Sequence, residues 1–495
     1  MTENKTDVLV IGAGNAGLIA ALAAHEQGAR VTVIEWAPKE RRGGNSAFAA
    51  GFFRCAFQDF EEIRPFLHPT PTLPFDQIEV EPYTPDAFNN DLMRVTEGLA
   101  DPALAEMLVQ QSLPTVTWMA SKGIIWELDP GHAVQRNGRY FFRSASVPVA
   151  AKGGGKGLMD MLFASAEREG LEILYDARAV ELLVDRAGAV EGVELSTPQG
   201  RIAFHSQAVI LACGGFEANA EMRARYLGPG WDLVKVRGTR YNTGDGIKMA
   251  LDIGAMPSGH WSGCHASMID ADAADLEADN ADVTRYSFPL SIMVNQDGER
   301  FVDEGEDLSS FTYAKMGRKV LDQPGSIAYQ IFDQKTLRFL RGPYSNSRAV
   351  VARSIEELAE SLGISSQILI RTVEEFNAAV SEGEFDPSRR DGKCTRGISP
   401  GKSNWALPLD SPPFYAYAVT CGITFTYGGL RIDQECRVLT ADERPIPNLW
   451  AAGEATGGFF YHNYPGASGL TRGAVTGRLA GLSAALSAKG RTMGQ

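Results

Sequence analysis

The chain has 495 residues, more than one hydrophobic core usually organises, so its length predicts two domains. A formal net charge of −14 without any basic run excludes a typical nucleic-acid-binding protein. Six scattered cysteines form no C-x-x-C pair, and no targeting signal precedes Val8, where the first strand is expected. The longest apolar run is far too short to span a membrane. Together these features predict a soluble, reduced, cytoplasmic protein.

A strand–helix–strand unit is predicted first along the chain. The β-rich runs Val8–Ile11 and Val31–Ile34 flank an Ala- and Leu-rich helix that we expect from Ala16 to Glu26, ended by Gly28. Such a unit implies a parallel sheet covered by helices. The fold class is therefore predicted to be α/β, with a Rossmann-type domain.

The sequence pattern changes in the middle of the chain. Acidic loops lie near residues 271–282, a strand–turn–strand signal spans 286–304, and a helical pattern covers 365–380. The α/β pattern resumes afterwards with a late strand and a final helix rich in small residues. We therefore predict a discontinuous FAD-binding domain, residues 1–266 and 416–495, with an inserted α+β capping or substrate domain at 267–415.

The first strand runs into a glycine turn of the form G-x-G-x-x-G. Its first glycine permits the tight turn, its second lets a pyrophosphate approach, and its third lets helix and strand pack closely. The pyrophosphate would lie on the helix N-terminus. Glu35, at the end of the second strand, is placed to accept hydrogen bonds from a ribose diol. The predicted nucleotide-binding residues are Gly12, Ala13, Gly14, Asn15, Ala16, Gly17 and Glu35.

This fingerprint serves NAD and FAD alike. The glycine-rich stretch at residues 41–54 closely follows the acidic residue, and a second glycine motif at Ala451–Gly458 comes more than 400 residues after the first. A long cofactor contacted by both ends of the chain accounts for these features, whereas an NAD domain would not need the late motif. FAD is therefore the predicted cofactor.

The chain contains the motifs GAGNAG, GGNSAFAAGFFRC, GGGKGLMDML, VILACGGF, NTGDGIKMA, WSGCHA, GERFVDEG and YPGASGLTRGAVTGRLAG. In this combination the chain resembles the flavoprotein family of soluble fumarate reductases, succinate dehydrogenase flavoprotein subunits and 3-ketosteroid dehydrogenases. Within that family it is most similar to the tricarballylate dehydrogenase branch. The resemblance covers nearly the whole chain.

The resemblance implies further FAD-binding residues. It places residues 43–46 at the pyrophosphate and close to the flavin. A strand that ends at Ala179 and Val180 would face the adenine, and the N-terminus of the last helix would lie beside the isoalloxazine. The residues carried over by motif are Trp36, Arg42, Gly43, Gly44, Asn45, Ser46, Gly51, Ala179, Val180, Gly214, Gly215, Gly244, Asp245, Gly453, Glu454, Ser468, Gly469 and Leu470.

The chain departs from the family where fumarate reductases bind substrate. Leu308 stands nearest to the catalytic arginine of that family, Thr424 and Phe425 replace its histidine pair, and Tyr464 replaces a second arginine. Fumarate-reductase-like reduction is therefore disfavoured, though it stays open as an alternative. Tyr313 and Tyr464 approximately match two tyrosines of the ketosteroid dehydrogenase branch.

Oxidation of an alkane to an alkene removes a hydride to flavin N5 and a proton to a base. Tyr313 is the first candidate for that base because Lys315 and Arg318 follow it, and cations lower a phenol pKa. A packed tyrosine is the structural alternative. The predicted catalytic residues are Tyr313, Tyr464, His265 and Arg54, and further arginines considered for a carboxylate are Arg143, Arg285 and Arg472.

The sequence thus predicts an FAD-dependent oxidoreductase acting on a C–C bond next to a carboxylate or ketone. We expect a small-molecule substrate, a carboxylate, and a separate electron acceptor because no haem C-x-x-C-H motif is present. No metal-ligand spacing is found, so no metal is expected. The alternatives are a dehydrogenase of a hydrophobic enone, as in ketosteroid oxidation, and a non-catalytic subunit that relays electrons.

Overall fold

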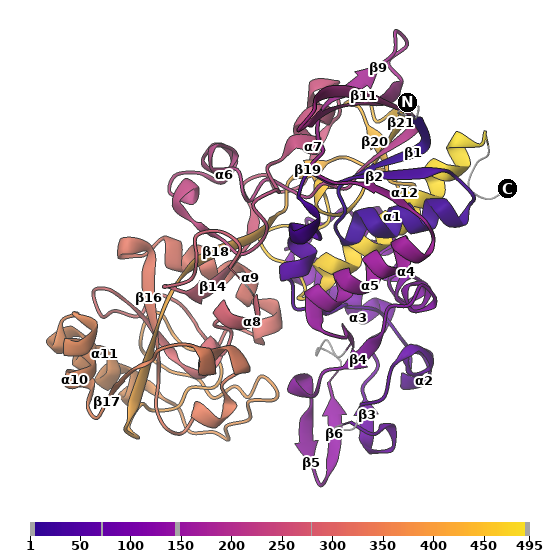
Figure 1. The fold of residues 1–495 in the computed structure, drawn as a ribbon. Helices are drawn as coiled ribbons and strands as arrows, with labels where there is room; N and C mark the ends of the chain where they lie inside the picture. The colour runs from indigo at the N-terminus through magenta and orange to yellow at the C-terminus, as the bar shows by residue number, and fades with distance from the viewer. Residues whose placement is uncertain (1–4, 71–72, 144–148, 279, 491–495) are drawn as a thin grey trace. The chain divides into compact units, whose positions relative to one another are not determined.

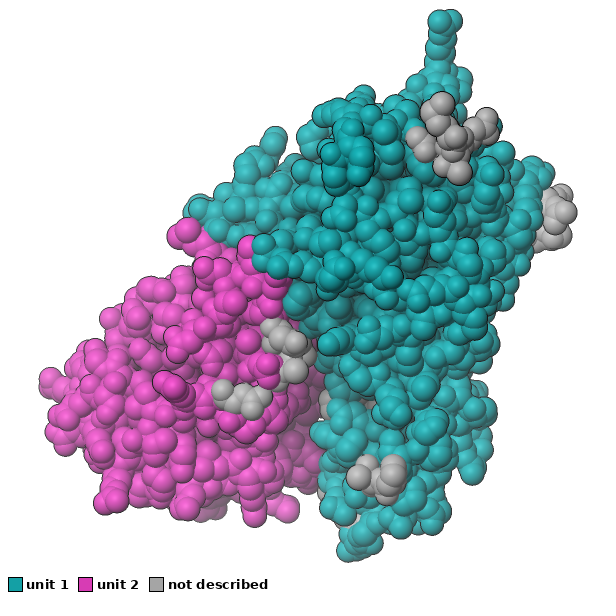
Figure 2. All heavy atoms as spheres, in the orientation of Figure 1, with its two compact units in different colours: residues 1–232, 238–264, 425–495 teal, residues 233–237, 265–424 magenta. Residues whose placement is uncertain are grey.

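The computed structural model describes residues 5–70, 73–143, 149–278 and 280–490. It divides into two compact units, coloured separately in Figure 2. Unit 1 comprises residues 1–232, 238–264 and 425–495, and unit 2 comprises residues 233–237 and 265–424. Each unit is described below by itself. No helix within the described ranges is long and apolar enough to cross a membrane.

Unit 1 is built on an eight-stranded sheet (Figure 1). Its main path runs β20-β21-β11-β1-β2-β8, and all pairs along it are parallel except β20 with β21. The remaining strands, β10 and β9, extend β11 as an antiparallel ribbon. The bounds are β1 Lys5–Ile11, β2 Val31–Ile34, β8 Glu172–Leu174, β9 Arg178–Val184, β10 Val190–Thr197, β11 Gly200–Leu211, β20 Arg437–Leu439 and β21 Pro445–Ala451.

The central strands are buried on both faces, as expected for a parallel sheet between helices. Two glycines set the turn from β1 into α1 (Asn15–Glu26). Gly12 has φ +103°, and a Cβ at Gly17 would lie 1.8 Å from the carbonyl oxygen of Gly12. Only glycine fits either position, so this turn places the helix N-terminus at the carboxyl end of β1.

The last helix, α12 (Ser468–Ala488), packs along α1 (Figure 1). A Cβ at Gly477 would lie 2.4 Å from the carbonyl oxygen of Ala16, and one at Gly481 would lie 2.2 Å from that of Ala20. The small-residue repeat of α12 therefore lets two helix backbones touch. This contact brings the two ends of the chain together in one unit.

The other elements of unit 1 flank this sheet or extend from it. Its helices are α2 Phe60–Ile63, α3 Pro85–Val95, α4 Pro102–Ser121, α5 Gly154–Arg168, α6 Ala220–Leu227 and α7 Asp245–Asp252. Its short strands are β3 Ile78–Val80, β4 Trp126–Leu128, β5 Val134–Arg136, β6 Arg139–Phe142, β7 Val149–Ala151, β13 Pro257–Ser258 and β19 Gly429–Leu430.

Unit 2 holds a six-stranded sheet around the long strand β18. The path runs β12-β18-β16-β15, with β14 and β17 also paired to β18. The strands are β12 Lys235–Val236, β14 Cys264–Asp270, β15 Ile292–Asn295, β16 Ile327–Phe332, β17 Val350–Ala352 and β18 Phe414–Thr426. The helices are α8 Asn280–Val283, α9 Tyr313–Leu321, α10 Ile355–Leu362 and α11 Ser366–Ala379.

Helices α10 and α11 bury Leu358 and Phe376 against Ile292 and Ile331 of the sheet, which forms one core of unit 2. The prediction of an α/β fold with an inserted α+β region is confirmed. The predicted strand–turn–strand at 286–304 is wrong in its second half. Only β15 forms, it pairs with β16, and a single bridge joins Val294 to Arg300.

Candidate functional site

The N-terminus of α1 is an open anion site. No side chain caps it at Gly14, and the N–H of Asn15 donates to Oγ of Ser46 at 3.1 Å. The backbone of Gly44 passes close by, with a Cβ at that residue only 3.8 Å from the Cα of Gly14. Uncapped N–H groups at the positive end of a helix dipole, lined by glycines, suit a pyrophosphate.

Glu35 follows β2 and its carboxylate is fixed by backbone. Oε2 accepts from the N–H of Ala13 at 2.8 Å, and Oε1 accepts from that of Ala37 at 2.7 Å. Burial raises the pKa of Glu35, while these two N–H groups oppose that change. Each carboxylate oxygen has a further lone pair, so Glu35 can also accept ribose hydroxyls, as the sequence predicts.

Beside this turn, Trp36 lies in a small aromatic and ionic group. The guanidinium of Arg178 stacks over the Trp36 ring at 4.2 Å and pairs in a bidentate manner with Asp245 at 2.7 and 2.8 Å. Tyr241 meets the other edge of Trp36, with ring centroids 5.2 Å apart. Arg178 is the first residue of β9 and Asp245 is the first residue of α7, so their ion pair joins the starts of the two elements.

Ala179 and Val180 stand at the beginning of β9 (Arg178–Val184), not at the end of a strand as predicted. The β-branched run continues to Val184 because β9 pairs with β10. The guanidinium of Arg42 is fixed separately, donating to the Tyr175 hydroxyl at 2.8 Å and lying 3.9 Å over Phe163.

A buried carboxyl pair lies on the other side of the glycine segments. Glu217 is fully buried and is hydrogen-bonded to Glu454, and its Oε1 accepts from the side-chain amides of Asn45 and Asn242. Burial and the charge of Glu454 raise the pKa of Glu217 well above its usual range. Glu454 accepts from the N–H of Thr426 at 2.7 Å.

This pair explains the glycines nearby. A Cβ at Gly215 would lie 2.1 Å from Oε1 of Glu454, and one at Gly214, at φ +78°, would lie 2.3 Å from Asn242. Gly453 has φ +69°, and its Cβ would meet that of Ala16 at 2.8 Å. The second glycine motif thus packs directly on the first helix.

The start of α12 contacts the N-terminus of α1. The side-chain amide of Asn15 donates a hydrogen bond to the Leu470 carbonyl at 2.9 Å. Ser468 is fully buried, and its hydroxyl donates to the Pro465 carbonyl. The remaining predicted cofactor residues have these positions: Gly43 at φ +110°, Gly51 at φ +80° against Gly154, Gly244 at φ +82° before Asp245, and Gly469 against the Phe425 ring. All of these residues belong to unit 1, the unit that carries the nucleotide-binding turn.

Two arginines are buried in unit 1 near the entry to α12. Arg54 is 2% exposed, its Nε donates to the Gly466 carbonyl at 2.7 Å, and its guanidinium lies 5.1 Å over the Tyr83 ring. Arg472, also 2% exposed, lies among aromatic rings. Tyr464 is buried in the same aromatic group and packs on Phe425 with centroids 5.1 Å apart.

Unit 2 contains a buried histidine that packs on a tyrosine pair. The Tyr313 ring meets His265 edge to face, with centroids 5.0 Å apart, and packs on Tyr286 at 4.7 Å. Burial and the charge of Arg237 hold the pKa of His265 well below its usual range, so its imidazole is neutral at pH 7. Lys315 pairs with Glu306 at 2.7 Å, which directs that cation to a carboxylate.

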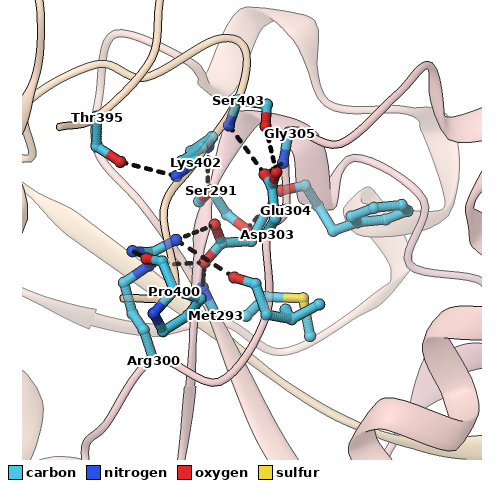
Figure 3. A network of polar contacts seen from close by, with 12 residues as sticks. Ser291, Met293, Arg300, Asp303, Glu304, Gly305, Thr395, Pro400, Lys402 and Ser403 are labelled. Carbon is cyan, nitrogen blue, oxygen red and sulfur yellow. Dashed lines mark hydrogen bonds and ion pairs between the residues drawn. The ribbon is translucent and has the colours of Figure 1, made fainter. Parts of the chain in front are cut away.

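The segment before Tyr313 is held by a buried polar network (Figure 3). Arg300 forms a bidentate pair with Glu304, at 3.0 and 2.6 Å, and donates to the Pro400 carbonyl. Glu304 also accepts from the N–H of Met293. Lys402 donates to the Ser291 carbonyl at 2.6 Å. The network fixes the GERFVDEG turn to β15, and the chain leaves it toward α9.

Comparisons with known proteins identify the family of this chain. The model of a family described as an FAD binding domain matches residues 7–470, almost the whole chain. The chain belongs to the FAD-dependent fumarate reductase and succinate dehydrogenase flavoprotein family. The prediction of FAD as cofactor is thereby confirmed. The chain is an FAD-dependent oxidoreductase acting on CH–CH groups.

Three relatives show the range of this flavoprotein family. A probable fumarate reductase of Shewanella frigidimarina (strain NCIMB 400), Ifc3, is 30% identical over 98% of this chain and 75% of its own length. A 4-oxocyclohexanecarboxylate 2-dehydrogenase of Sinomonas cyclohexanicum is 32% identical over 68% of this chain and 62% of its own. The open conformation of a flavocytochrome c3 fumarate reductase superposes with a TM-score of 0.74, at 29% identity, over 98% of this chain and 79% of that one.

The structure brings most predicted flavoprotein residues together within unit 1 and places Tyr313 and His265 together in unit 2. The three further arginines lie in different environments. Arg143 pairs with Glu81 near the surface, and Arg285 is buried with Asp270 as its counterion at 2.5 Å. Only Arg472 lies deep in the FAD-binding unit.

Some residues of this flavoprotein's site escaped the sequence analysis. Glu217, Asn242 and Thr426 surround Glu454, and Arg237 and Tyr286 surround His265 and Tyr313. Local signals existed for Glu217, which directly follows the Gly214–Phe216 motif, and for Asn242, which begins the NTGDGIKMA motif. The others reach the site through contacts between distant segments. Among the described residues, no group of three or more His, Cys, Asp or Glu side chains is arranged to hold a metal ion.

Proposed function

We propose that the chain oxidises a C–C bond next to a carboxylate, as a dehydrogenase of tricarballylate type, and passes the electrons to a separate acceptor. The observation that carries this proposal is Arg54. Its guanidinium is buried in the FAD-binding unit and tied to Gly466, just before α12. A buried guanidinium next to the cofactor segment suits a carboxylate, which it can bind through paired hydrogen bonds.

FAD, when bound, supplies the hydride acceptor. We propose Tyr313 as the group that takes the proton from the adjacent carbon, and Tyr464 as a group that orients the substrate. His265 packs on Tyr313 as a neutral imidazole, so it can hydrogen-bond to substrate without adding a charge. These roles rest on family motifs together with the ring contacts described above.

Two facts favour oxidation over fumarate-type reduction. The positions at which fumarate reductases carry substrate-binding histidine and arginine hold Phe425 and Tyr464, and both are buried among aromatic rings. One relative is named a dehydrogenase of a cyclic keto acid. That name and the aromatic rings also favour a second candidate, a cyclic ketone as substrate.

A cytoplasmic location is part of the proposal. All six cysteines lie in the described part of the chain, and none of them forms a disulfide. Reduced thiols are usual in the cytoplasm.

The test is anaerobic mixing of the holoenzyme with tricarballylate, and in parallel with 4-oxocyclohexanecarboxylate, while the flavin absorbance is recorded. We expect tricarballylate to bleach the flavin. Bleaching by the ketone alone would replace the first candidate with the second, and no bleaching by either would contradict both.

The proton-transfer role has its own test. A Tyr313→Phe variant should reduce its flavin at least about 100-fold more slowly, because general acid–base groups contribute that much. Tyr329→Phe, at a half-buried tyrosine of β16 in the same unit, is the matched control and should keep the wild-type rate. Equal rates in the two variants would remove Tyr313 from the mechanism.

A further inference from the structure

The guanidinium of Arg472 is enclosed by aromatic rings within unit 1. Its carbon atom Cζ lies 5.0 Å from the centre of the Phe460 ring, 5.4 Å from that of Phe425 and 5.9 Å from that of Phe459. These rings contact one another and Tyr464, so they form one cluster. We call it the aromatic cage: Phe425, Phe459, Phe460 and Tyr464.

Arg472 is charged and almost completely buried. Burial lowers the pKa of Arg472 to about 10, and the charge of Glu454 opposes that change. The side chain therefore carries a full positive charge at pH 7. A buried cation is costly unless hydrogen bonds and an opposite charge compensate it.

Within the described residues, neither a hydrogen bond nor an ion pair reaches this guanidinium, and its Nε is buried without an acceptor. Glu454 influences it by charge only, and its own Oε1 is taken by the N–H and hydroxyl of Thr426. Cation–π contacts offset part of the desolvation cost, but aromatic faces accept none of the five N–H donors of a guanidinium. The donors of this guanidinium are therefore available to the acceptors of a ligand.

We propose that Arg472 binds a carboxylate of the substrate inside the aromatic cage, as a site separate from Arg54. The inference rests on the proposed function and narrows it, because a carboxylate at Arg472 in addition to one at Arg54 requires a substrate with at least two carboxylates. The planar fork of a guanidinium matches a carboxylate in a bidentate manner. The rings hold the fork in place before the ligand arrives, which reduces the entropy lost on binding.

A structural role for Arg472 makes a different prediction. A cation that only balanced the charge of Glu454 would support FAD binding and stability but would not distinguish an acid from its amide. The test therefore measures dissociation constants for the holoenzyme, from the change in flavin absorbance. The probes are succinate, which has two carboxylates, and succinamate, in which one of the two is replaced by a carboxamide.

For the wild-type holoenzyme we expect the amide to bind at least about 30-fold more weakly than the acid, as is usual when one partner of a buried charge pair is removed. In Arg472→Met the acid should bind as weakly as the amide does to the wild type, and the two probes should be bound alike. Arg472→Lys should recover part of the preference for the acid, because the charge remains and the fork is lost. Retained discrimination in Arg472→Met would overturn the inference.

A measurement without any variant gives a second test, in case Arg472→Met loses FAD. The wild type should bind succinate at least about 30-fold more tightly than butyrate, which has the same length and one carboxylate fewer. Equal affinity would overturn the inference. The proposed function fails separately: acid discrimination that depends on Arg472, with no flavin bleaching, would keep the site and reject the reaction.

Discussion

Two buried arginines, one in each unit, show opposite solutions to the same physical problem. In unit 2, Arg300 forms a bidentate pair with Glu304 and donates to the Pro400 carbonyl. In unit 1, Arg472 is 2% exposed, yet no acceptor in the described part of the chain reaches it. Both residues also lie about 5 Å over a phenylalanine ring.

The difference separates a structural charge from one prepared for a ligand. Arg300 has its counterion four residues along the chain, so its charge is compensated by folding alone. Arg472 is held by hydrophobic rings, and its compensation must come from outside the chain. A buried cation is therefore evidence for a ligand only when its hydrogen-bond partners have been counted.

The largest expected effect on stability comes from removing the counterion of Arg300 in unit 2. Glu304→Gln removes the counterion and leaves the charge of Arg300 buried, which should lower the free energy of unfolding by about 3–5 kcal/mol. Denaturant unfolding of the holoenzyme measures it. The double variant Arg300→Met, Glu304→Leu should recover most of the loss, since apolar residues of similar volume replace such pairs well. No recovery would show that the network stabilises the unit in another way.

A second, smaller effect concerns Lys402, which belongs to the same network. Burial lowers the pKa of Lys402 to about 8, so between pH 8 and about 10.5 the unfolded chain binds a proton that the folded chain does not. The stability of the wild type should therefore rise through this window, by about 2–3 kcal/mol relative to Lys402→Met. Unfolding of both proteins at pH 7.5, 9 and 10.5 measures it, and parallel curves would contradict a neutralised lysine.

A third effect on stability, of about 1 kcal/mol, is expected below pH 6.5. Since the folded pKa of His265 is depressed, only the unfolded chain takes up this proton as the pH falls below about 6.5. The wild type should lose stability from pH 6.5 to 5.5, and His265→Gln should lose about 1 kcal/mol less. Melting temperatures at the two pH values measure it. An equal loss in both proteins would mean that His265 is protonated in the fold.

Local patterns in the sequence predicted the nucleotide-binding part well. The turn at Gly12–Gly17 is dictated by steric contacts between neighbouring residues, so a short motif carries its geometry. The family motifs led to FAD, which the family match confirmed. The roles assigned to Tyr313, Tyr464, His265 and Arg54 stay predictions.

Features that depend on distant segments could not be predicted. The second strand expected after Gly298 does not form, because the polar pair of Arg300 and Glu304 turns that segment inward and β15 pairs with β16. Glu217 meets Glu454 across 237 residues of sequence, so nothing local indicates the pair. Arg472 was one of several arginines in the sequence, and only its burial and its aromatic neighbours set it apart.

The most direct test of the contrast between the arginines is the melting temperature of the holoenzyme with and without tricarballylate, for the wild type and Arg472→Met. A ligand that binds only the folded state raises the melting temperature, and the rise grows as the ligand concentration exceeds the dissociation constant. We predict that Arg472→Met without ligand melts no lower than the wild type, and that the same concentration of tricarballylate stabilises the variant much less than the wild type. An unliganded variant that melts far below the wild type, but gains as much from the ligand, would contradict the account.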